Sequence, residues 1–141
     1  LQHAGHAFLY SSVTHLMLGR SPTDEANRRV LMCDREAAGV TAACAVIRRD
    51  VWDEVGGMWE GLPASFNDVD LCQKLRFRGY RIVVSPHARL YHFESVSRNP
   101  QVLAWEVEAI NDRWRHLVYR DPYLNPNWAD HRAQLIEPTN W

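Results

Sequence analysis

The segment from Asn67 to Arg76 constrains the fold more than any other part of this chain. Its apolar positions recur at mostly helical spacing, and Gly79 follows at the place where a left-handed residue ends many helices. Asp68 falls in or just before the first turn, where unpaired backbone N–H groups stabilise a carboxylate. The segment therefore predicts a helix that starts near Asn67 and carries an acid at its N-terminus.

An acid at such a position has two interpretations. On a rigid helix start beside a loop, Asp68 could abstract a proton or meet a metal ion. Acids at helix starts are also common without any chemical role, and Asp70 two positions on would point elsewhere around the helix. On this feature alone the simple helix-start role is favoured.

Length and composition bound the class of protein. A chain of 141 residues with 46% hydrophobic content can bury one core, which predicts a single domain over residues 1–141. The 16 Lys and Arg residues nearly balance the 17 Asp and Glu residues, so nucleic acid is not an expected partner. No apolar stretch approaches the length of a membrane span.

The cysteines and most histidines show no metal-binding spacing. The three cysteines are interpreted as reduced core residues of a cytoplasmic protein, not as a disulfide framework or a zinc site: Cys33, Cys44 and Cys72. Six histidines are interpreted as surface or polar-network residues: His3, His6, His15, His87, His116 and His131. The sequence therefore predicts no closed metal centre from these side chains.

The remaining pattern alternates strands and helices. In chain order we expect a strand at Gln2–Tyr10, a buried strand at Val40–Arg48, a short helix capped by Asp50 and closed at Gly56–Gly57, strands at Arg81–Val84 and Ala88–His92 on either side of Pro86, and a long helix after Pro100 that reaches Val118. Together these elements predict an α/β fold with an open mixed sheet and flanking helices.

Several segments in a fixed order carry a family resemblance. They are Val40–Arg49, Val51–Gly57, Asn67–Cys72, Gly79–Val83, Ser85–Ala88, Tyr91–Arg98, Arg113–Trp114 and Asp121–Asn127. This set resembles the C-terminal half of family 2 glycosyltransferases, which have the GT-A fold. The resemblance implies a partial GT-A sheet. Before Val40 there is no recognisable nucleotide-binding unit and no Asp-x-Asp, so the N-terminal nucleotide-binding half is expected to be absent from this chain.

The resemblance implies a reaction and its residues. The implied reaction is the transfer of a sugar from a nucleotide-diphospho-sugar to a carbohydrate or other hydroxyl acceptor. It proceeds with inversion at the anomeric carbon and with Asp68 as the catalytic base. In the intact enzyme a Mg²⁺ or Mn²⁺ ion would be held by His92 and by an Asp-x-Asp outside this chain. Ser97 and Arg98 would assist at the diphosphate. The isolated chain is expected to be inactive.

The acceptor side is assigned by the same resemblance to Gly56, Gly57, Trp59 and Asp70. Trp59 stands where the family has a carboxylate, and two roles stay open for its indole: stacking on a sugar face or filling the core. Asn67 stands where the family commonly has Glu, so acidic support beside Asp68 is missing.

Two other functional classes remain. One is a non-catalytic carbohydrate-binding or assembly module with the same fold. The other is a metal-dependent hydrolase built on Asp68, Asp70 and His92, which ranks last because too few further ligands are recognisable. The expected partners are the nucleotide-sugar donor, the acceptor and the missing half of the enzyme. The expected location is the cytoplasm, with peripheral association at the inner face of the membrane as an open alternative.

Overall fold

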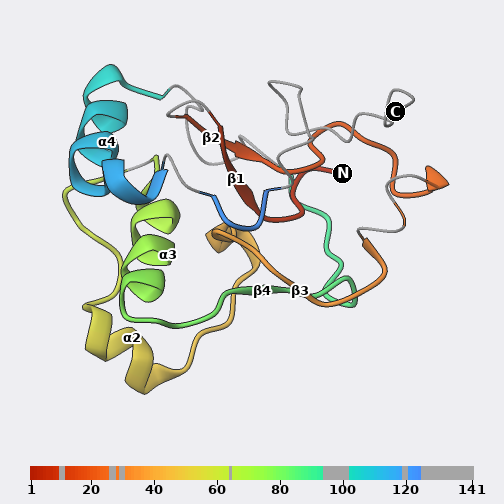
Figure 1. The fold of residues 1–141 in the computed structure, drawn as a ribbon, viewed down its shortest axis with the longest axis horizontal. Helices are drawn as coiled ribbons and strands as arrows, with labels where there is room; N and C mark the ends of the chain where they lie inside the picture. The colour runs from red at the N-terminus through yellow and green to blue at the C-terminus, as the bar shows by residue number, and fades with distance from the viewer. Residues whose placement is uncertain are drawn as a thin grey trace.

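The computed structural model describes residues 1–9, 12–25, 28, 31–63, 65–93, 102–118 and 121–124. In chain order its elements are β1 His6–Leu9, β2 Ser12–His15, β3 Arg35–Glu36, the 3₁₀ helix η1 Ala42–Cys44, α2 Arg49–Val55, α3 Asn67–Phe77, β4 Val83–Val84 and α4 Ala104–Val118 (Figure 1). The fold is mixed α/β, as predicted. None of the helices in the described ranges is long and apolar enough to cross a membrane.

The strands form two small sheets instead of the open sheet that was predicted. β1 pairs antiparallel with β2, which places His6 opposite His15, and β3 pairs antiparallel with β4. The strand predicted at Val40–Arg48 is wrong: this stretch contains η1, and Val46 is fully exposed. The strand predicted at Ala88–His92 is irregular backbone as well. Small and β-branched residues favour a strand only when a neighbour supplies pairing and packing, which composition does not reveal.

The helix predictions agree with the structure. α3 starts at Asn67, and Gly79 after its end has a φ of +82°. α2 ends at Gly56, whose left-handed backbone caps the helix as expected. Its N-terminal residue differs from the prediction, because Arg48 occupies the cap position and Asp50 lies in the first turn.

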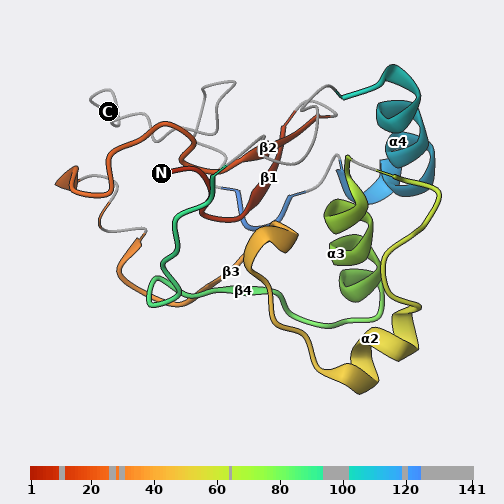
Figure 2. The ribbon, with the colours of Figure 1, turned by 180° about the vertical axis from the view of Figure 1, so that it is seen from behind.

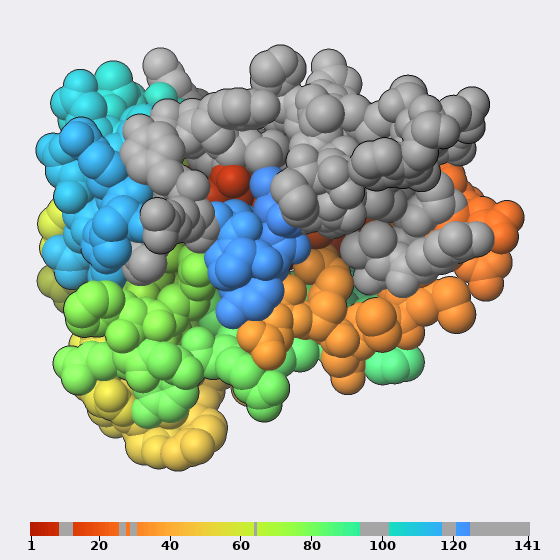
Figure 3. Space-filling view, viewed as in Figure 1, coloured from red at the N-terminus to blue at the C-terminus, as the bar shows by residue number. Residues whose placement is uncertain are grey.

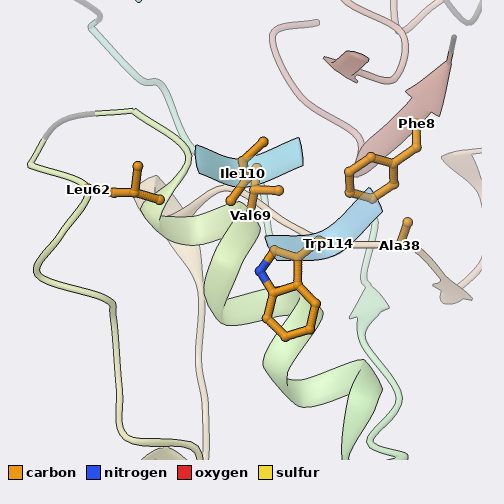
Figure 4. Close-up of a cluster of buried hydrophobic side chains, with 6 residues drawn as sticks. All are labelled: Phe8, Ala38, Leu62, Val69, Ile110 and Trp114. Atoms are coloured by element: carbon orange, nitrogen blue, oxygen red, sulfur yellow. The ribbon is translucent and has the colours of Figure 1, made fainter. Parts of the chain in front are cut away.

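The main hydrophobic core joins the helices to the hairpin (Figure 4). Its buried members come from β1, from both long helices and from two connecting segments: Phe8, Ala38, Leu62, Val69, Ile110 and Trp114. Each large apolar side chain buried in this way contributes about 1.5–3 kcal/mol. α3 and α4 lie side by side in both ribbon views and form adjoining green and blue areas on the surface (Figures 2 and 3). The packing fixes α3 as the central element.

The start of α3 is held in a strained backbone conformation. Phe66, the cap residue, has a φ of +61°, which is unusual for a bulky side chain. Its side chain packs against the main core, and its carbonyl oxygen accepts the N–H of Asp70 at 2.8 Å. The Asn67 side chain accepts the N–H of Asp68 at 2.8 Å. These contacts determine the direction in which the helix enters, and with it the place of Asp68.

Candidate functional site

Asp68 occupies the first turn of α3, as predicted, and its side chain is half-buried. Oδ2 accepts the backbone N–H of Ala42 at 3.1 Å, and Oδ1 accepts the N–H of Val69 at 2.9 Å. Two oriented donors therefore fix the carboxylate, while each oxygen keeps a further lone pair for another partner. The arrangement suits a group that accepts a proton from a hydroxyl at the surface.

The segment that carries Ala42 is attached to α3 by side chains of that helix. Gln73 Nε2 donates to the carbonyl oxygen of Ala38 at 3.3 Å, and Cys72 Sγ lies 3.4 Å from the N of Val40. Burial raises the pKa of the Cys72 thiol to about 12, so it is an unreactive core group. η1 lies between the hairpin and α3 (Figure 2). The stretch Val40–Arg48, which was predicted as a strand, thus forms a fixed support beside Asp68.

Asp70 is fully buried and bound to cations. Its Oδ1 accepts from Arg113 Nε at 2.7 Å and from Trp114 Nε1 at 2.8 Å, and Lys74 Nζ lies 3.0 Å from Oδ2. The carboxylate has no exposed surface for an acceptor sugar in this conformation. Its observed role is to join α4 to α3, and acceptor binding by Asp70 stays a prediction.

The Gly56–Gly57 turn is linked to the same network. Gly57 has a φ of +61°, and a Cβ there would lie 2.8 Å from the ring of Trp52, so glycine is required. Lys74 Nζ donates to the carbonyl oxygen of Gly57 at 2.9 Å. Lys74 therefore joins the turn to Asp70. Acceptor binding at the turn remains a prediction.

Trp59 is partly buried and packs against the main core. A Cβ on Gly61 would lie 2.5 Å from its ring, and the Arg113 guanidinium lies 4.8 Å from the centroid of the ring. The indole therefore fills space and takes part in a cation–π contact. Stacking on a sugar remains a prediction.

Of the remaining predicted residues, His92 alone lies within the described part of the chain. His92 is exposed on irregular backbone, and no hydrogen bond or ion pair within the described residues joins it to Asp68. Ser97 and Arg98 lie outside the described residues. In the part of the chain that the structure describes, no three His, Cys, Asp or Glu side chains are placed to hold a metal ion.

A cluster of three histidines behind Asp68 was not foreseen as a unit. The rings of His3 and His15 have centroids 4.8 Å apart, and His6 lies 5.1 Å from the first and 5.8 Å from the second. His3 Nε2 accepts the N–H of Thr41, the residue before Ala42, at 3.0 Å. We call His3, His6 and His15 the histidine cluster. His6 and His15 meet because the register of β1 and β2 places them opposite each other, which the sequence alone did not signal.

Glu106 is a second buried acid that the sequence interpretation missed. Its Oε1 accepts the N–H of Ser65 at 2.9 Å, and its Oε2 accepts the N–H of Leu103 at 3.0 Å. Glu106 reaches back to the residue before its helix as the Glu of a capping box does, but Leu103 stands where that pattern has Ser or Thr, so the sequence carried only half of the signal. Of the cysteines, Cys72 is buried as expected, whereas Cys33 and Cys44 are exposed.

Comparison with known proteins gives two partial relatives. Over 107 residues the chain is 43% identical to the uncharacterized protein y4gI of Sinorhizobium fredii, a match that covers 70% of this chain and 12% of that protein. Over 101 residues it is 36% identical to the O-antigen biosynthesis protein RfbC of Myxococcus xanthus, covering 66% of this chain and 8% of that protein.

The chain thus spans about an eighth or less of the length of these relatives. No family model matches the chain, and no solved structure matches it significantly. The second match relates the chain to a protein named for O-antigen biosynthesis, which agrees with the class of relative expected from the sequence.

Proposed function

We propose that this chain supplies the catalytic base and the acceptor side of an inverting family 2 glycosyltransferase in polysaccharide biosynthesis. The observation that carries the proposal is the half-buried Asp68 carboxylate at the start of α3, fixed by two backbone N–H groups. The similarity to RfbC supports the product class, and the ordered segments from Val40 to Asn127 support the family.

The proposed step is a single displacement. An acceptor hydroxyl oxygen forms a bond to the anomeric carbon of the donor as Asp68 takes the hydroxyl proton. The bond from the anomeric carbon to the nucleotide diphosphate breaks, and the diphosphate leaves with the electron pair. The N–H groups of Ala42 and Val69 hold the carboxylate in one orientation before the reaction, which reduces the reorganisation that proton transfer requires.

A divalent cation remains part of the proposal for the longer protein. Mg²⁺ or Mn²⁺ would offset the charge of the leaving diphosphate. The exposed His92 by itself does not fit such an ion, because a stable site needs several converging oxygen or nitrogen ligands. The proposed step in this chain therefore uses the Asp68 carboxylate and no metal ligand.

The test is Asp68→Asn in a full-length protein that contains this chain. Asn keeps the size and the helix-start geometry but cannot take the proton, so we expect transfer from a panel of UDP- and GDP-sugars to fall by about 10²–10⁴-fold. The release of UDP or GDP measures the rate, and circular dichroism follows the fold.

The matched control is Asp53→Asn on α2, an exposed acid paired only with Arg49 among the contacts of the described residues. It should retain the normal rate. If Asp68→Asn also transfers sugar at the normal rate, Asp68 is not the base. Retained binding of the acceptor with no turnover in the unsubstituted protein would instead support the carbohydrate-binding module.

A further inference from the structure

The hydrogen bonds of the histidine cluster define its protonation. His3 Nδ1 lies 2.8 Å from His15 Nδ1, and His3 Nε2 accepts the backbone N–H of Thr41. A backbone N–H can only donate, so His3 Nε2 carries no proton. The proton of a neutral His3 is then on Nδ1, and His15 Nδ1 accepts it. The Thr41 N–H thus donates to His3, and His3 in turn donates to His15.

His6 is the most buried member of the cluster. Its ring is tightly packed, since a Cβ on Gly39 would lie 2.7 Å from His6 Nδ1, and that nitrogen has no hydrogen-bond partner within the described residues. Burial lowers the pKa of His6 to about 4, with Asp68 acting in the opposite direction and His15 adding to the lowering. The site therefore excludes charge at His6 even though a carboxylate faces it.

Among the described residues, the groups that shift the pKa of His3 all disfavour its protonation. Burial lowers its pKa to about 3, and His6, His15 and Arg35 on β3 add to the effect. Arg35 is held in place by its hydrogen bond to the carbonyl oxygen of Ala4. Among the described residues, the charged groups that act on the cluster are therefore the acid Asp68 at the start of α3 and the cation Arg35 on β3.

The same geometry distinguishes the cluster from a metal centre. Two ligands of a tetrahedral zinc site with bonds of 2.0–2.1 Å lie roughly 3.3 Å apart. The distance of 2.8 Å between the two Nδ1 atoms is that of a hydrogen bond. The described residues also place no group of three ligands around a common point.

We propose that the histidine cluster is a positioning device for Asp68, in which neutral imidazoles hold the Thr41–Ala42 segment so that Ala42 can donate to the carboxylate. Protonation of His3 at Nε2 would place an N–H against the N–H of Thr41 and break that attachment. The segment would then separate from Asp68. The effect on transfer rests on the proposed function, whereas the structural coupling does not.

Nuclear magnetic resonance of the isolated chain tests the coupling directly. The imidazole ¹⁵N shifts should identify His3 as neutral with the proton on Nδ1 from pH 7.5 down to about pH 4. The amide protection factors of Thr41 and Ala42 should fall at least tenfold as the cluster takes up protons. A His3 ring that titrates near pH 6.5, or one with the proton on Nε2 at neutral pH, would overturn the proposal.

The stability profile supplies a second readout. The folded pKa values of His3 and His6 lie below the unfolded value of 6.5. In the pH range between the folded and the unfolded pKa, the unfolded chain therefore binds more protons than the folded chain. The stabilisation is complete above pH 6.5 and is lost as the pH falls to about 4 for His6 and to about 3 for His3. Each imidazole should lower the folding equilibrium constant by up to tenfold per pH unit.

A substitution separates attachment from titration. In His3→Gln the amide oxygen can accept the Thr41 N–H without titrating, so the amide protection of Thr41 should persist in acid and the pH dependence should become shallower. His87→Gln, at an exposed histidine, is the control and should leave the profile unchanged. If both variants retain the full pH dependence, the cluster is not the titrating element. Sugar transfer is not measured, so a failure here is distinct from a failure of the proposed base.

Discussion

The α3–α4 interface and the β1–β2 hairpin bury polar side chains in opposite ways. At the interface, the fully buried Asp70 is charged and is matched by Arg113, Lys74 and the indole of Trp114. In the hairpin region, burial keeps His3 and His6 of the histidine cluster uncharged. One region offsets charge with opposite charge, and the other avoids charge.

The difference predicts where each region is vulnerable. A buried ion pair adds little net stability compared with apolar packing, but removing one partner leaves the other uncompensated. A cluster of neutral imidazoles is stable at neutral pH and loses stability when the imidazoles are protonated at lower pH. Substitution of a charged residue should therefore destabilise the interface, whereas a fall in pH should destabilise the hairpin.

The largest expected effect is that of Asp70→Asn. The change leaves Lys74, whose side chain is 13% exposed, facing a neutral group at the centre of the interface. We expect the free energy of unfolding to fall by about 3–5 kcal/mol, measured by urea denaturation. Because of this expected loss, Asp53→Asn and not Asp70→Asn is the suitable control for Asp68→Asn.

Asp53→Asn is the matched comparison for Asp70→Asn. Arg49 and Asp53 form an ion pair at the same i,i+4 spacing as Asp70 and Lys74, but both side chains are more than half exposed. We expect a loss of about 0.3–0.5 kcal/mol. Equal losses in the two variants would show that burial does not distinguish the pairs.

Trp114→Phe tests the hydrogen bond of the interface. The aromatic ring is retained in smaller form, and the donor to Asp70 Oδ1 is removed. A hydrogen bond to a charged group contributes about 1.5–3 kcal/mol, and we expect the free energy of unfolding to fall by this amount. Trp105→Phe on the same helix, where the side chain is 43% exposed, should change stability by less than about 0.5 kcal/mol. A similar loss in both would remove the special role of the indole N–H.

Gly39→Ala tests how closely the hairpin packs on α3. The added Cβ would lie 2.7 Å from His6 Nδ1 and 3.0 Å from Cys72 Cβ, and both residues are buried. Overpacking of this kind costs about 1–3 kcal/mol. The imidazole resonances of His6 should move as well, which nuclear magnetic resonance would detect.

Gly19→Ala separates packing from backbone strain. Gly19 has a φ of +77° with nothing within 4 Å of an added Cβ, so the substitution costs about 1–2 kcal/mol through conformation alone. The resonances of the histidine cluster should not change in Gly19→Ala.

A Gly39→Ala variant with unshifted imidazole signals would contradict the packing of the hairpin against α3.

The local signals in the sequence were sufficient for the helices. The spacing of Val69, Leu71 and Leu75 and the left-handed Gly79 determine α3, and the Gly56–Gly57 pair ends α2. The strands were predictable only in part, because the pairing partner of a strand lies elsewhere in the chain. The position of Asp68 at the start of a helix could be predicted for the same local reason.

The sequence by itself therefore determined the helices, the glycine-marked C-terminal ends of α2 and α3 and the acid at the start of α3, since these depend on residues within a few positions of one another. Only the tertiary structure decided that Asp70 is buried, that Val40–Arg48 supports Asp68 without forming a strand, and that three histidines from the hairpin region meet. Each of these depends on which distant segments pack together. Burial then determines whether a polar group is charged, paired or neutral.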